Sequence, residues 1–148
     1  MIRVLEAEQN KFDSLFDKTR DLYSTFFPNG SCFYETDNDG GFTSDVFWFF
    51  YDDYSSLAEA KQNIGKDIFQ VNFTVAHLVG DSLMVLCNRA YVKRKETLHG
   101  DRVRTIYRDW DKSKRFKEDL MTREKWLKRI GEFFKDLKKT VELNGWEI

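Results

Sequence analysis

The sequence is poor in proline, cysteine and histidine: its 148 residues include one proline, two cysteines and two histidines. Cys32 and Cys87 form at most one disulfide, which excludes a disulfide-stapled fold, and we expect two reduced, buried thiols. Neither the cysteines nor His77 and His99 have the spacing of zinc ligands, so we predict no metal. Phosphate-binding glycine loops, dinucleotide fingerprints and nucleophile-elbow motifs are also missing, so we predict no cofactor.

Long hydrophobic runs are missing as well. The longest apolar runs, Val46–Tyr51 and Leu83–Cys87, are far shorter than the roughly 20 residues of a membrane span. Residues 1–8 mix charged and apolar side chains and do not resemble a secretory signal. The sequence therefore predicts a cytoplasmic protein with no membrane contact, from a bacterium or a phage-infected cell.

Aromatic residues are abundant, with 14 Phe, 6 Tyr and 4 Trp. Rings in this number supply much of a core or an aromatic binding face. The length predicts one domain over residues 1–148.

Hydrophobic periodicity predicts an α+β fold with the element order α-β-β-α-β-β-β-α. The first helix is expected from about residue 5 to 26, a short helix is expected to begin after Ser56, and a long one is expected from about residue 122 to 143. Strands are expected over residues 31–36, 45–51, 68–78, 83–95 and 102–110. We therefore expect a single two-layer domain, in which amphipathic N- and C-terminal helices cover an antiparallel sheet.

The last helix carries an apolar stripe that includes Phe134. We expect this stripe to cover the sheet face formed by the alternating residues Phe69, Val71, Phe73 and Val75. The competing hypothesis is that the stripe is a seam completed by another chain. The oligomeric state is left open.

The net charge of −1 hides a strong asymmetry. Residues 1–60 carry a net charge of −8, and residues 61–148 carry a net charge of +7. Acidic side chains beside aromatic anchors are typical of a surface that binds a basic protein. The predicted protein-binding residues are Glu35, Asp37, Asp39, Asp45, Asp52, Asp53, Tyr34, Tyr51 and Tyr54.

A basic segment with interleaved aromatic residues offers an alternative site. Cations beside exposed rings are suited to phosphate contacts and base stacking. The nucleic-acid hypothesis rests on a hairpin over residues 89–110, with Arg89, Tyr91, Lys93, Arg94, Arg102, Arg104, Tyr107 and Arg108. Interspersed acidic residues such as Glu96 and Asp109 count against it, because alternating charge also protects an edge hairpin from aggregation.

His77 supports a third hypothesis, a small-ligand or enzymatic site in which it acts as the base near Glu35, Arg89 or Tyr91. A satisfied core histidine is the alternative, because no nucleophile has a defined spacing to it. We favour a non-enzymatic protein-binding module of the inhibitor or immunity type, which neutralises a toxin or effector. Its partner is expected to be a basic protein, and no catalytic residue is assigned.

Overall fold

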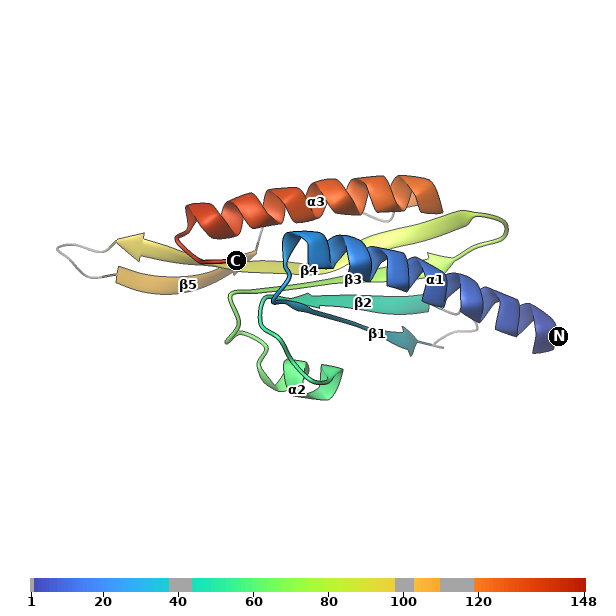
Figure 1. Cartoon of the computed structure of the whole chain (residues 1–148), viewed down its shortest axis with the longest axis horizontal. Coiled ribbons are helices and arrows are strands. Elements are labelled where there is room, and N and C mark those ends of the chain that lie inside the picture. Colours follow the sequence, from blue (N-terminus) through green and yellow to red (C-terminus); the bar gives the residue numbers. More distant parts are fainter. Residues whose placement is uncertain (1, 38–43, 98–102, 110–118) are drawn as a thin grey trace.

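The computed structural model describes residues 2–37, 44–97, 103–109 and 119–148 (Figure 1). In chain order the elements are α1 (Ile2–Phe26), β1 (Ser31–Asp37), β2 (Ser44–Phe50), α2 (Leu57–Gln62), β3 (Phe69–His77), β4 (Ser82–Thr97), β5 (Val103–Asp109), β6 (Asp119–Thr122) and α3 (Arg123–Leu143). The predicted α+β class is confirmed, with helices at both ends of the chain and an antiparallel sheet between them.

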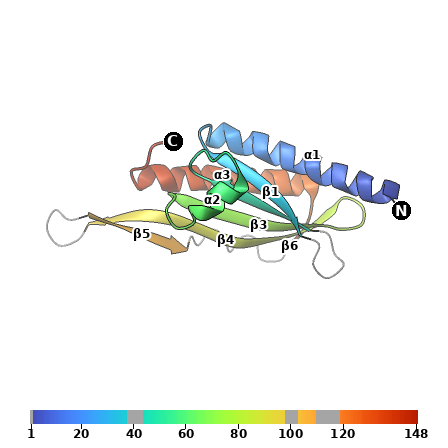
Figure 2. The same cartoon turned by 90° about the horizontal axis from the view of Figure 1, so that it is seen from below.

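The sheet has the strand order β1-β2-β3-β4-β5, so each of these strands is paired with its neighbour in sequence. β4 is 16 residues long, and its second half pairs with β5 while its first half pairs with β6. Strand β6 is an addition to the predicted order. The paired ends of β4 and β5 extend beyond the C-terminal end of α3 in both views (Figures 1 and 2).

Helices α1 and α3 lie side by side against one face of the sheet (Figures 1 and 2). Trp126 and Phe133 of α3 place their rings 5.4 and 5.2 Å from the ring of Phe73 in β3. Phe134 lies 4.9 Å from Phe49 in β2. The prediction that the stripe of α3 covers the alternating apolar residues of β3 is confirmed.

A buried hydrogen-bonded chain joins the two long helices. Thr19 of α1 donates its hydroxyl to the carbonyl of Leu15 at 2.7 Å and accepts the indole N–H of Trp126 at 3.0 Å. All three residues are buried. This contact fixes α3 against α1, because a buried indole N–H is costly without an acceptor.

Helix α2 lies at the opposite margin of the molecule from α3 (Figure 1). Its N-cap is Ser56 as predicted, since the Ser56 side chain accepts the backbone N–H of Glu59 at 3.2 Å. The ammonium of Lys61 sits 5.1 Å from the centre of the Trp48 ring. Because Phe47 and Phe49 face α1 and α3, strand alternation places Trp48 on the other side of the sheet, and α2 covers part of that side.

A bulge interrupts the pairing of β3 and β4. Asn72 is opposite Arg89, but the next residue, Phe73, is opposite Cys87, which leaves Asn88 as an extra residue in β4. Such a bulge changes the direction in which the following side chains point. Here it keeps Arg89 and Tyr91 on the side away from α1 and α3, while Ala90 and Val92 are buried in the core.

Within the described ranges, none of the helices combines the length and the apolar character needed to cross a membrane. Cys32 and Cys87 are half-buried and form no disulfide with each other. Burial raises the pKa of the Cys32 thiol well above its usual value.

Candidate functional site

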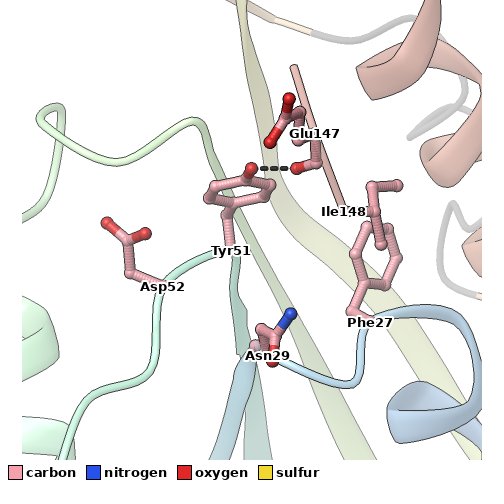
Figure 3. Close-up of a pocket in the computed structure, with 7 residues that line it drawn as sticks. Phe27, Asn29, Tyr51, Asp52, Glu147 and Ile148 are labelled. Atoms are coloured by element: carbon pink, nitrogen blue, oxygen red, sulfur yellow. Dashed lines mark hydrogen bonds between the residues drawn. The ribbon is translucent and has the colours of Figure 1, made fainter.

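A pocket of about 300 Å³ lies where the end of β2, the turn after α1 and the residues after α3 meet (Figure 3). Its lining consists of Phe27, Asn29, Gly30, Tyr51, Asp52, Glu147 and Ile148. We call it the Tyr51 pocket. In Figure 3 the rings of Tyr51 and Phe27 form two of its walls, and the amide of Asn29 points between them.

Local turns bring these distant segments together. After α1, the N–H of Gly30 donates to the carbonyl of Phe27 at 3.1 Å and closes a tight turn. After α3, Gly145 adopts a φ of 83°, a left-handed conformation that only glycine adopts cheaply. The chain then reverses, and the N–H of Trp146 donates to the carbonyl of Val141 at 3.1 Å.

Tyr51 connects the pocket to the core. Its hydroxyl donates to the backbone carbonyl of Glu147 (Figure 3), and its ring lies 5.9 Å from that of the buried Phe69. Burial raises the pKa of Tyr51, and the negative charges of Asp52, Glu147 and Asp67 raise it further. The acidic residues around Tyr51 therefore act on its hydroxyl in the same direction as burial.

Asp67 is the buried member of this acidic group, with 2% of its surface exposed. Its two carboxylate oxygens accept the backbone N–H groups of Ile68 at 2.8 Å and Asp52 at 3.3 Å. Burial raises the pKa of Asp67 to about 6. The two backbone hydrogen bonds act in the opposite direction, and the carboxylate of Asp52 adds to the increase.

Tyr54 lies beside the same carboxylates. Burial raises the pKa of Tyr54 well above its usual value, and the charges of Asp67 and Asp52 add to the effect. Ser31 fixes the backbone here, because its hydroxyl donates to the carbonyl of Asp52 at 2.6 Å and accepts the N–H of Tyr54 at 3.3 Å. The loop that follows β2 is thus held in one conformation around Asp67.

The structure brings together part of the predicted acidic and aromatic set. Tyr51, Asp52, Asp53 and Tyr54 share the loop after β2, where Asp52 and Asp53 are exposed. Of these four, Tyr51 and Asp52 line the Tyr51 pocket.

The remaining members of that set lie elsewhere. Glu35 forms an ion pair with Lys61 at 2.8 Å, and Tyr34 packs against the ring of Phe16 at 4.7 Å. Asp37 is the last residue of β1, and Asp39 lies outside the described residues.

Asp45 requires a correction, because it is only 2% exposed and its carboxylate is not accessible to a partner. It is the second residue of β2, on the side of the strand that faces the helices, and it accepts the hydroxyl of Thr36 at 2.9 Å. The burial was not predicted because Asp45 lies next to an expected turn in the sequence.

The predicted basic hairpin is formed by β4 and β5. Arg89 is exposed, and its guanidinium lies 5.3 Å from the centre of the Tyr91 ring. Lys93 donates to the carbonyl of Lys66 at 2.6 Å. Arg94 belongs to β4, and Arg104, Tyr107 and Arg108 belong to β5, where Arg104 is opposite Glu96 and Arg108 is opposite Val92. Arg102 lies outside the described residues.

His77 is the last residue of β3, half-buried and opposite the core residue Leu83. Glu35, Arg89 and Tyr91 lie on the other side of the sheet, since Tyr34 and Ala90, their neighbours in sequence, face the helices. The four residues of the His77 hypothesis therefore do not converge. Among the described side chains, no three His, Cys, Asp or Glu residues are grouped so that they could hold a metal ion.

Sequence reasoning missed five residues of the pocket lining, and also Asp67, whose charge acts on Tyr51: the five are Phe27, Asn29, Gly30, Glu147 and Ile148. Phe27 and Asn29 flank the single proline, which marked only the end of a helix. Asp67 and Glu147 were missed because the contacts that bring them to the site, with Asp52 and Tyr51, span 15 and 96 positions of the chain.

No protein-family model matches this chain, and neither a curated protein nor a solved structure shows significant similarity to it. The site must therefore be interpreted from its own chemistry.

Gly30 provides a test of the geometry of the pocket. A Cβ atom at this position would lie 2.8 Å from the carbonyl oxygen of Phe50 and 3.0 Å from the hydroxyl of Tyr23, which donates to that same oxygen at 2.6 Å. We expect Gly30→Ala to lower the free energy of unfolding by about 1–3 kcal/mol in urea denaturation, because the backbone must move.

Gly131→Ala is the matched control. Its Cβ would meet only the flexible end of Leu22, at 3.3 Å, and α3 would gain a better helix former. We expect a change smaller than about 1 kcal/mol. Equal stability of Gly30→Ala and the unmodified protein would contradict the close approach of Gly30 to β2.

Proposed function

We propose that this protein is a non-enzymatic protein-binding module of the inhibitor or immunity type, and that its Tyr51 pocket receives a basic side chain of a toxin or effector. The observation that carries the proposal is a pocket walled by the rings of Tyr51 and Phe27, whose lining also includes the acidic residues Asp52 and Glu147. Neither carboxylate has an ion-pair partner among the residues that the structure describes.

The chemistry of the pocket fits an arginine or lysine side chain. Aromatic faces attract cations, and carboxylates bind guanidinium and ammonium groups through charge-assisted hydrogen bonds. The side-chain amide of Asn29 points its nitrogen, a hydrogen-bond donor, into the same space (Figure 3), so the carboxylates are the acceptors for the cation. A basic side chain inserted here would also relieve the repulsion between Asp52 and Asp67.

Rigidity supports a role in binding. The loop after β2 is fixed by Ser31 and by the backbone hydrogen bonds to Asp67, so little conformational entropy is lost when a partner docks. Exposed Asp53 extends the negative surface beyond the pocket and would accelerate association with a basic partner.

The experiment is affinity capture from the native cell, with the product of the adjacent gene as the first candidate, followed by calorimetry on the purified pair. The double variant Asp52→Asn/Glu147→Gln removes two charges with little change of shape. We expect it to weaken binding about tenfold or more, because a charge-assisted hydrogen bond contributes about 1.5–3 kcal/mol. Affinity should also fall as salt is raised.

The control is Glu124→Gln/Glu132→Gln, which removes the same charge from exposed positions of α3. A captured protein supports the proposal only when the pocket variant loses it and the control retains it. Equal losses in both variants would show nonspecific attraction and would count against the pocket. A monomer that captures no partner, or a pocket variant with full affinity, would overturn the proposal.

A further inference from the structure

The face of the sheet away from α1 and α3 carries a row of four side chains, one from each of the strands β1 to β4. In register, Phe33 is opposite Trp48, Trp48 is opposite Asn72, and Asn72 is opposite Arg89. We call this row the outer row. It combines two aromatic rings, an amide and a guanidinium over adjacent strands.

Cations and rings are paired along this face. The guanidinium of Arg89 lies 5.3 Å from the centre of the Tyr91 ring, and the ammonium of Lys61 lies 5.1 Å from the centre of the Trp48 ring. Lys61 is neutralised by Glu35, whereas Arg89 is exposed and forms no ion pair with a described residue. Arg89 is thus a cation of this face that is available to an anion.

Two polar groups of the outer row have no hydrogen-bond partner among the residues that the structure describes, although such groups normally have one. Asn72 is only 6% exposed; its side-chain amide makes no hydrogen bond to a residue that the structure describes, but its polar atoms are not fully buried and reach the outer surface. The indole N–H of Trp48 is buried and has no acceptor among those residues. Because Val71 and Phe73 point into the core, the amide of Asn72 points to the outer face, between Trp48 and Arg89.

The geometry points to a binding site for a single strand of nucleic acid on the outer face. Aromatic side chains on a sheet stack with unpaired bases, and a nearby arginine binds the backbone phosphates. The amide of Asn72 and the indole N–H of Trp48 supply a donor–acceptor pair and a donor for the edge of a stacked base.

The occupant is single-stranded because an aromatic side chain can stack on a base only when that base is unpaired and separated from its neighbour. The site shares no residue with the Tyr51 pocket and is independent of the proposed protein partner. It also differs from the hairpin hypothesis, since three members of the outer row lie on β1, β2 and β3.

The test measures fluorescence anisotropy of the full chain with labelled single-stranded RNA and DNA of about ten nucleotides, at low salt and at physiological salt. We expect saturable binding that weakens as salt rises, and weaker binding of the duplex of the same sequence. Tyr91→Ala should reduce affinity about 5- to 150-fold, the range expected when one base loses its aromatic platform, whereas Tyr91→Phe should retain most of the affinity.

Charge reversal has a matched control in this chain. Arg89→Glu should abolish most of the binding, whereas Arg20→Glu should change it little, because Arg20 sits over the ring of Phe16 on α1, on the other side of the sheet from the outer row. Asn72→Asp should also weaken binding, since it places a negative charge between Trp48 and Arg89. Circular dichroism of each variant confirms folding.

Absence of binding at low salt, tighter binding of duplex, or equal losses from Arg89→Glu and Arg20→Glu would each overturn the inference. The pocket variant Asp52→Asn/Glu147→Gln should bind oligonucleotide normally. A failure of oligonucleotide binding at the outer row can therefore be distinguished from a failure of protein binding at the Tyr51 pocket.

Discussion

Phe134→Ala is expected to lower the free energy of unfolding by about 3–5 kcal/mol, a large part of the roughly 5–15 kcal/mol that stabilises a typical domain. Phe134 is fully buried, and its ring lies 5.0 Å from Tyr23 of α1 and 4.9 Å from Phe49 of β2. The truncation therefore removes contacts among all three packed elements. It also leaves a cavity that rigid aromatic neighbours cannot fill.

Leu143→Ala is the matched control on the same helix. Leu143 is 87% exposed, so the same kind of truncation should change stability by less than about 0.5 kcal/mol. Urea denaturation at several protein concentrations measures both variants. We expect midpoints that do not depend on concentration, because the stripe of α3 is covered by the protein's own sheet. A midpoint that rises with concentration would show that another chain completes the stripe.

The helices and strands whose apolar residues recur with a regular period were predictable from the sequence. The alternation over residues 69–77 predicted β3, and the apolar positions three and four residues apart predicted α3 within one residue of its observed start. Strand β6 was not predictable in this way, because four residues are too few to display a period. Its pairing with β4 is a tertiary event, and residues 119–122 on their own resemble the approach to a helix.

The candidate sites depended on information that local patterns do not contain. The sequence indicated that acid and aromatic residues gather after β2, and the structure places Tyr51 and Asp52 there. It did not indicate that Asp45 is buried, because burial follows from which face of β2 meets the helices. The outer row depends on the register of three strand pairs. It also depends on the bulge at Asn88, which determines the side of the sheet on which the Arg89 side chain lies. No single segment carries that information.

Asp67→Asn is expected to remove most of a pH dependence of stability that the unmodified protein shows between about pH 4 and pH 7. The native state raises the pKa of Asp67 from 3.8 to about 6, chiefly because the carboxyl group is buried. Within this window the native protein therefore holds a proton that the unfolded chain releases. The stabilisation is complete below the pKa that Asp67 has in the unfolded chain. It is lost as the pH rises through the pKa that Asp67 has in the native protein.

The size of the effect follows from the two pKa values. One pKa unit corresponds to about 1.4 kcal/mol, so stability should decline by about 3 kcal/mol across the window and then stay constant. The groups that face Asp67 are the carboxylate of Asp52, the backbone N–H of Ile68 and the phenols of Tyr54 and Tyr51. Neither phenol ionises in this window, because the pKa of each is raised above its ordinary value.

The Asp67→Asn substitution keeps the shape of the side chain and one acceptor for the N–H of Ile68, but the new amide would face the N–H of Asp52 with a donor instead of an acceptor. The diagnostic quantity is therefore the slope of stability against pH, and not the absolute stability of the variant.

The control Asp53→Asn removes an exposed carboxylate from the same loop and should preserve the decline of the unmodified protein. Urea denaturation at constant ionic strength across the window measures the slopes, and carbon NMR of the Asp67 carboxyl reports its titration directly. A decline that persists in Asp67→Asn would show that another group holds the proton and that the Asp52–Asp67 pair does not govern the acid response of this loop.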